Sequence, residues 1–172
     1  MIEDSGKKEL GLLEKIMLFI QGFKGYKEKE LRREMDRLVR EAVVRNLDEA
    51  EQVFRSALTT LSGPVPEDVM TLIDIIIYRI QRLKDSIRVA DSGYSGFFDL
   101  VKVREELLDK VLSKDAKLLE VSKKVSKDIK DLSNKGFIGM DTRNRLLMII
   151  EALKVLEEEF RERMKILSGL ED

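Results

Sequence analysis

Apolar residues with helical spacing run through the middle of the chain. From residue 69 to residue 90 they advance by alternating steps of four and three: Val69, Ile73, Ile76, Ile80, Leu83, Ile87 and Ala90. This heptad spacing places all of these side chains on one face of a helix, whereas a strand would need a repeat of two. A helix with one long apolar face has to bury it, so the spacing predicts helix packing within a larger core.

Similar apolar stripes cover the rest of the chain. One runs through Leu31, Met35, Leu38 and Ala42 and continues after a shift through Leu47, Ala50, Phe54, Ala57 and Leu61, and another runs through Leu146, Ile149, Leu153, Leu156, Phe160 and Leu167. No segment alternates with period two long enough to predict a strand. Breakers cluster at 22–25, 63–66, 93–96 and 134–139. We therefore expect a short helix at about 8–22 and long helices at about 27–62, 67–92, 98–133 and 141–168.

Short connections between these helices predict that successive helices run antiparallel. The predicted fold class is all-α: an elongated antiparallel up-down four-helix bundle with coiled-coil-like heptads and an additional short N-terminal amphipathic helix. The predicted units are the N-terminal amphipathic helix and turn at 1–25 and a single helical-bundle domain at 26–172. We expect Pro66 in the first turn of its helix and Asp141 as an N-cap.

The expected helix at 98–133 has the least regular stripe. Its apolar positions are interrupted by Arg104, Asp115 and Ser122. Because a lone buried carboxylate is costly, we expect the stripe to drift onto Leu112 and Leu119 and to leave Asp115 at the margin of the core. A break of the helix near residues 113–115 is the alternative.

The residue types exclude several kinds of chemistry. The chain has no histidine and no cysteine, which removes histidine- and thiol-dependent catalytic triads and the usual zinc sites. Neither of the common glycine-rich phosphate motifs occurs. The stretch 91–99 resembles a calcium loop, but Lys102 stands where a bidentate glutamate is needed. We predict that the protein is not an enzyme and has no catalytic residue, cofactor or metal ligand, with a carboxylate-only magnesium site as the open alternative.

Charge and composition predict a cytoplasmic protein with little affinity for nucleic acid. The 32 Lys and Arg residues balance 33 Asp and Glu residues, whereas nucleic-acid-binding proteins usually carry a basic excess. The acidic start does not fit a secretory signal, and no apolar run reaches the roughly 20 residues that span a bilayer. A charged fraction of 38% with few Asn and Gln residues is typical of thermophile proteins, although long exposed helices would produce it as well.

Residues 8–23 combine an apolar ridge with cationic borders. The ridge is formed by Leu12, Ile16, Phe19 and Phe23, and the lysines are Lys7, Lys8, Lys15, Lys24 and Lys27. Such a helix can lie on a membrane surface or fill a partner's groove. We favour a third interpretation, in which it folds back over the bundle and covers surplus apolar residues. A homodimer would cover the same surplus, which comprises Ile75, Ile77, Leu147 and Met148.

Two turns combine glycine with aromatic residues, at 22–26 and 93–99. In an up-down bundle both lie at the same end, which gives a candidate interaction surface consisting of Phe19, Phe23, Tyr26, Tyr94, Phe97 and Phe98. The alternative is purely structural: Gly93 ends a helix, Ser95 caps the next one, and the two phenylalanines plug the core. With the sequences GYKEKE and GYSGFFD, these turns resemble a family of uncharacterised prokaryotic all-helical proteins over about the first 130 residues. This resemblance implies no activity.

A basic run extends from Lys24 to Arg45, with five acids among eight cations. The spacing Glu28–Arg32, Arg37–Glu41 and Glu41–Arg45 predicts a solvated, self-paired helix face. The leading functional prediction is therefore a non-enzymatic scaffold or adaptor that acts through protein–protein contact, including self-association. Membrane-surface binding through the N-terminal helix is the second hypothesis, and a weak nucleic-acid-binding module is the third.

Overall fold

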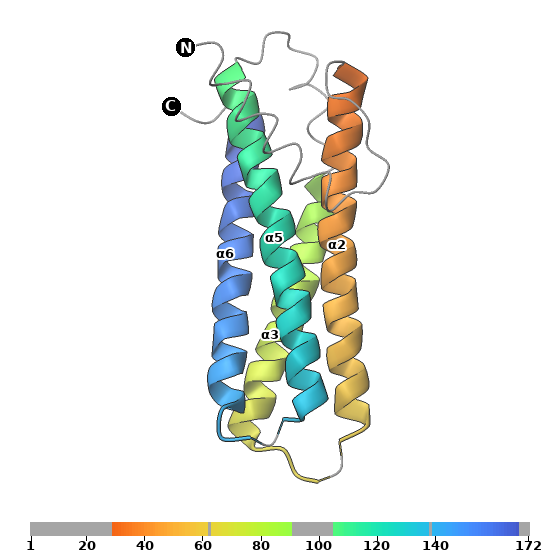
Figure 1. The fold of residues 1–172 in the computed structure, drawn as a ribbon, viewed down its shortest axis with the longest axis vertical. Helices are drawn as coiled ribbons and strands as arrows, with labels where there is room; N and C mark the ends of the chain where they lie inside the picture. The colour runs from red at the N-terminus through yellow and green to blue at the C-terminus, as the bar shows by residue number, and fades with distance from the viewer. Residues whose placement is uncertain (1–28, 62, 91–104, 138, 169–172) are drawn as a thin grey trace.

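The computed structural model describes residues 29–61, 63–90, 105–137 and 139–168, with side chains from residue 35 in the first segment and from residue 110 in the third. It contains four helices: α2 (Lys29–Thr59), α3 (Glu67–Val89), α5 (Glu105–Lys135) and α6 (Thr142–Ser168). No strand occurs in these segments, so the all-α prediction is confirmed (Figure 1). The expected helix at 8–22 and the unit at 1–25 lie outside the described residues.

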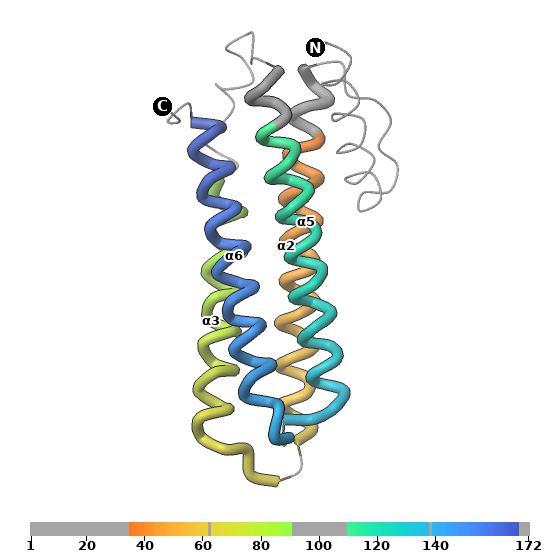
Figure 2. Tube along the Cα trace, turned by 60° about the vertical axis from the view of Figure 1, so that its left-hand side comes forward, coloured from red at the N-terminus to blue at the C-terminus, as the bar shows by residue number. Residues whose placement is uncertain are grey.

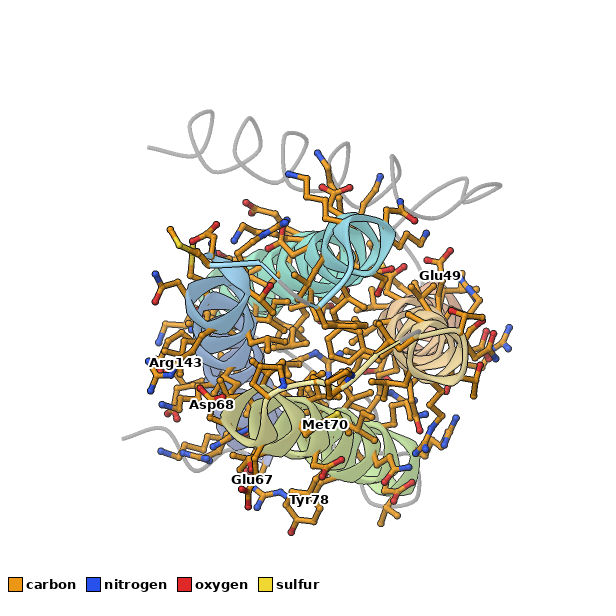
Figure 3. The ribbon with its side chains drawn as sticks, turned by 90° about the horizontal axis from the view of Figure 1, so that it is seen from below. Glu49, Glu67, Asp68, Met70, Tyr78 and Arg143 are labelled. Atoms are coloured by element: carbon orange, nitrogen blue, oxygen red, sulfur yellow. The ribbon has the colours of Figure 1, made fainter. Side chains whose placement is uncertain are left out.

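The four helices stand side by side, each with two main neighbours. Both α2 and α6 pack against α5 and against α3, so α3 and α5 occupy diagonal corners although they follow one another among the described helices (Figures 2 and 3). Figure 1 shows α2 and α5 running in one direction and α3 and α6 in the other. The parallel neighbours α2 and α5 therefore belong to different helical hairpins.

The predicted apolar stripes form the core. In α3 the positions from Val69 to Ile87 are all buried, and so are the six stripe positions of α6 from Leu146 to Leu167. In α2 the stripe drifts, because a straight helix does not keep a strict seven-residue repeat. Val39 is consequently fully buried, while Leu38 lies at the edge of the core.

The end of the bundle that joins α5 to α6 is closed by an aromatic pair. Gly136 follows the last residue of α5 with a φ of 76°, a conformation that glycine adopts without steric cost and that ends helices. The chain can then turn Phe137 inward, where its ring meets that of Phe54 edge-on at 5.6 Å. Both rings are buried, so the contact seals this end of the core.

One of the two predicted helix starts differs slightly from the structure. Pro66 is the N-cap residue of α3 and not part of its first turn, and its carbonyl accepts the bond from the Met70 amide at 3.0 Å. At the start of α6 the side-chain bond comes from Thr142, whose hydroxyl accepts the Gly139 amide at 3.0 Å. This bond closes the turn before the helix. Asp141 directly precedes α6, as predicted for an N-cap, and its carbonyl accepts the Arg145 amide at 3.1 Å.

Among the surplus apolar residues named from the sequence, some pack against other side chains of the described helices. Ile77 packs against the core, whereas Ile75 and Met148 remain exposed. Among the helices that the structure describes, none has the length and hydropathy needed to cross a bilayer.

The helices end at different levels. Arg88, in the last turn of α3, reaches Asp48 in the middle of α2. The start of α2, the start of α5 and the end of α6 extend further than α3 at this end of the molecule (Figure 1). The stagger creates the surroundings of the candidate site.

Candidate functional site

The interaction surface predicted from sequence cannot be placed, because Phe19, Phe23, Tyr26, Tyr94, Phe97 and Phe98 all lie outside the described residues. Two polar assemblies stand out within the described part of the chain. One is a buried ion cluster that joins three helices. The other is a groove beside it, between α2 and α3, lined mainly by arginines.

The buried ion cluster is built around Arg163 of α6, which is 1% exposed. Its Nε donates to Asp115 of α5, and its Nη2 donates to Asp36 of α2. The second carboxylate oxygen of Asp36 accepts two bonds from Arg40, at 3.0 and 2.7 Å. Two guanidinium groups and two carboxyl groups thus connect α2, α5 and α6 with balanced charge.

The cluster corrects the prediction for Asp115. Its residue surface is 3% exposed, so Asp115 does not lie at the margin, and α5 continues through it without a break. Leu112 and Leu119 are buried as predicted, but the carboxylate between them is buried too, because Arg163 reaches it from α6. The signal was available in the sequence: position 163 fits the stripe of α6, three residues after Phe160 and four before Leu167.

Ser122, another interruption of the same stripe, is also buried and also paired. Its hydroxyl donates to the Leu119 carbonyl at 3.1 Å and accepts from Asn46 of α2 at 3.0 Å. Asp115 and Ser122 therefore both have bonding partners on neighbouring helices, which is how buried polar groups avoid a desolvation penalty.

Burial and charge act against each other in the ion cluster. Burial raises the pKa of Asp115, and the pull of Arg163 does not fully offset it. Burial also favours a higher pKa at Asp36, but Arg163 and Arg40 outweigh it and hold that pKa below its usual value. For Arg163, the loss of solvent is outweighed by Asp115 and Asp36, so its pKa is raised and it stays charged.

The α2–α3 interface carries a second ionic layer. Lys84 of α3 lies 2.6 Å from both Asp48 and Glu51 of α2, and Gln81 donates to Glu51 at 2.9 Å. Burial alone would lower the pKa of Lys84, but the two carboxylates outweigh it and raise that pKa. Arg88 extends this layer by reaching Asp48 at 3.3 Å.

Next to the end of this layer lies a hollow of about 340 Å³, which we call the arginine groove. Its cationic lining comes from Arg37, Arg40 and Arg45 of α2 and Arg88 of α3, with Glu41 as the acidic member. Val44 and Ile87 supply its apolar lining. The volume falls within the usual range for binding pockets, roughly 300–1,000 Å³.

The carboxylate of Glu41 orients two of these arginines. It pairs with Arg37 at 2.7 Å and with Arg45 at 4.0 Å, which confirms both predicted i,i+4 pairs; the third, Glu28–Arg32, includes residues outside the described part. Arg40 departs from the predicted solvated face, because it turns inward to Asp36. It therefore lines the groove and belongs to the ion cluster at the same time.

Guanidinium groups arranged in this way recognise anionic groups. Each is planar, always charged and able to donate several hydrogen bonds, which suits carboxylates and phosphates.

Among the residues that the structure describes, no group of three or more acidic side chains is placed to hold a metal ion.

Comparison with protein-family models, with curated proteins and with solved structures finds no match to this chain. The resemblance of the two glycine-aromatic turns to a prokaryotic helical family therefore stays a prediction.

Proposed function

We propose that the protein is a non-enzymatic helical scaffold or adaptor that acts through protein–protein contact, with the arginine groove as its docking surface. The observation that carries this proposal is the groove itself: four arginines from two helices surround an apolar lining. Interfaces between proteins are enriched in arginine, and they typically place apolar contacts inside a polar rim.

The frame around the groove suits a docking role. The ion cluster ties α2 to α5 and α6, and the Lys84 layer ties α2 to α3, so the backbone on both sides of the groove is fixed from within. A surface held in one shape loses less entropy on binding than a mobile one. The ion cluster and the Lys84 layer thus stabilise the shape of the groove before a partner binds.

The wider architecture that we propose is an elongated up-down bundle in which residues 8–22 form an additional helix. This helix would cover apolar surface of the bundle, and the protein would act in the cytoplasm. A second copy of the chain is one candidate partner for the groove.

Site-specific photo-crosslinking tests the proposed function. A benzophenone amino acid is introduced at Arg37, in the lining of the groove, in the full-length protein in its native cells, and at Glu120 of α5 as an exposed control. We expect a discrete protein adduct from position 37 and none from position 120. If neither these positions nor others around the bundle give an adduct, and the purified protein sediments strictly as a monomer, the proposal is wrong.

A further inference from the structure

The arginine groove has a composition that selects a particular kind of partner. Its lining contains four cationic side chains and one acidic side chain, together with two aliphatic ones. We infer that the groove binds an acidic amphipathic segment of the partner protein, with carboxylates on Arg45 and Arg88 and apolar side chains against Val44. This inference rests on the proposed function and names the chemistry of the partner.

Arg45 and Arg88 are the principal contacts because both side chains are more than half exposed and their ion pairs within the bundle lie at the surface. The Nη1 of Arg45 lies 4.0 Å from Glu41, beyond hydrogen-bond distance. Arg88 contacts Asp48 at 3.3 Å and Asp85 at 3.7 Å. Their side chains are 63% and 52% exposed, and each guanidinium carries five N–H donors, so an approaching carboxylate can bind without displacing a buried pair.

The apolar lining adds a second requirement. Val44 lies between the arginines along α2 and is partly exposed, while Ile87 beneath it is buried in the core. A partner segment that carried only acidic side chains would leave the exposed surface of Val44 in contact with water. An aliphatic side chain set between acidic ones would cover it, and burial of apolar surface is favourable.

Charge also distinguishes a foreign segment from the chain's own amphipathic stretch. Residues 8–23 are flanked by Lys7, Lys8, Lys15, Lys24 and Lys27. Those cations would meet the arginines of the groove with the same sign, and like charges brought together are unfavourable. Complementary charge therefore favours an acidic segment from another protein.

The test uses fluorescence anisotropy with two labelled synthetic peptides of 18 residues, a length of about five helical turns. Both carry leucines at helical spacing; one has glutamates beside them and the other has lysines at the same positions. We expect the full-length protein to bind the acidic peptide and not the basic one. Because exposed charges are screened by salt, the affinity should fall as ionic strength rises.

Matched variants locate the contact. We expect Arg45→Glu and Arg88→Glu each to weaken binding of the acidic peptide by about tenfold or more, which corresponds to 1.4 kcal/mol. Arg143→Glu and Arg161→Glu change equally exposed arginines of α6 and should alter the affinity less than about twofold. Arg45→Gln, which removes the charge without reversing it, should weaken binding by a smaller factor, and circular dichroism confirms that each variant is folded.

The inference is overturned if the acidic peptide does not bind, if both peptides bind equally, or if the groove variants and the α6 controls lose equal affinity. A dimer of the wild type that Arg45→Glu dissociates, without peptide binding, would assign the groove to a second copy and also overturn it. A protein adduct from position 37 that persists in the Arg45→Glu and Arg88→Glu variants would leave the proposed function intact while this inference fails. Absence of any adduct, together with a strictly monomeric purified protein, would contradict the proposed function itself.

Discussion

Replacing Arg163 by methionine tests the central packing feature of the molecule. Methionine keeps much of the length of the arginine stem but removes the guanidinium that binds Asp115 and Asp36. Asp115 is then buried without its partner, while Asp36 keeps its two bonds from Arg40. The cost should therefore fall mainly on Asp115.

Breaking a buried ion pair by removing one partner typically costs about 3–5 kcal/mol. Arg40 limits the loss at Asp36, and the raised pKa of Asp115 lets that carboxyl take up a proton and shed its charge. We therefore expect Arg163→Met to lower the free energy of unfolding by about 3 kcal/mol, near the lower end of that range. The double variant Arg163→Met with Asp115→Leu should recover most of this loss, because it leaves no unpaired charge on α5.

The assay is urea-induced unfolding of the full-length protein at neutral pH, followed by circular dichroism. The matched control is Arg161→Met, two residues away on α6, where an exposed pair with Glu158 should contribute less than about 1 kcal/mol. A loss below about 1 kcal/mol for Arg163→Met, or equal losses for it and the control, would refute the buried pairing. The buried pairing would also be refuted if the stability loss of the double variant equalled the sum of the losses of Arg163→Met and Asp115→Leu measured singly.

Other perturbations follow from the same packing. Phe137→Ala removes a buried ring from the closed end of the bundle and should cost about 3–5 kcal/mol in urea unfolding, whereas Tyr78→Ala on the exposed face of α3 should stay within about 0.5 kcal/mol. Gly136→Ala should cost about 1–2 kcal/mol, because the positive φ strains the backbone although the new methyl group meets no atom within 4 Å. The pKa of Asp36 is lower in the folded state than its unfolded value of 3.8. Its ion pairs therefore contribute fully to the free energy of unfolding above that value, and this contribution is lost as the pH falls through the lower pKa of the folded state. The stability difference between wild type and Asp36→Asn should accordingly shrink between about pH 5 and about pH 2.5, as followed by thermal unfolding, and a constant difference would contradict this pairing.

The sequence predicts the helices because their pattern is local. The stripe of α3 from Val69 to Ile87 needs only the helical repeat to place every member in the core, and the structure buries them all. Asp115 shows where local reasoning fails. Its burial depends on a guanidinium 48 residues away on α6, and the prediction treated the carboxylate as unpaired although Arg163 occupied a stripe position of its own helix.

The arginine groove cannot be predicted from the spacing of apolar residues along the sequence. It forms because α3 ends beside the middle of α2, so that Arg88 lies within reach of α2 and its arginines. Helix spacing predicts that each helix packs against others, but not which ones become neighbours. The inward turn of Arg40 likewise requires Asp36 to face Arg163 across the bundle, which is a tertiary arrangement.

Amide chemical shifts measured during a titration test the docking role of the groove most directly. The full-length protein is labelled with nitrogen-15, and the acidic peptide is added in increments while the basic peptide serves as the control. The groove account predicts shift changes concentrated in residues 37–45 of α2 and in the last turn of α3 around Arg88. Changes spread evenly over the four helices, or confined to α5 and α6, would contradict it.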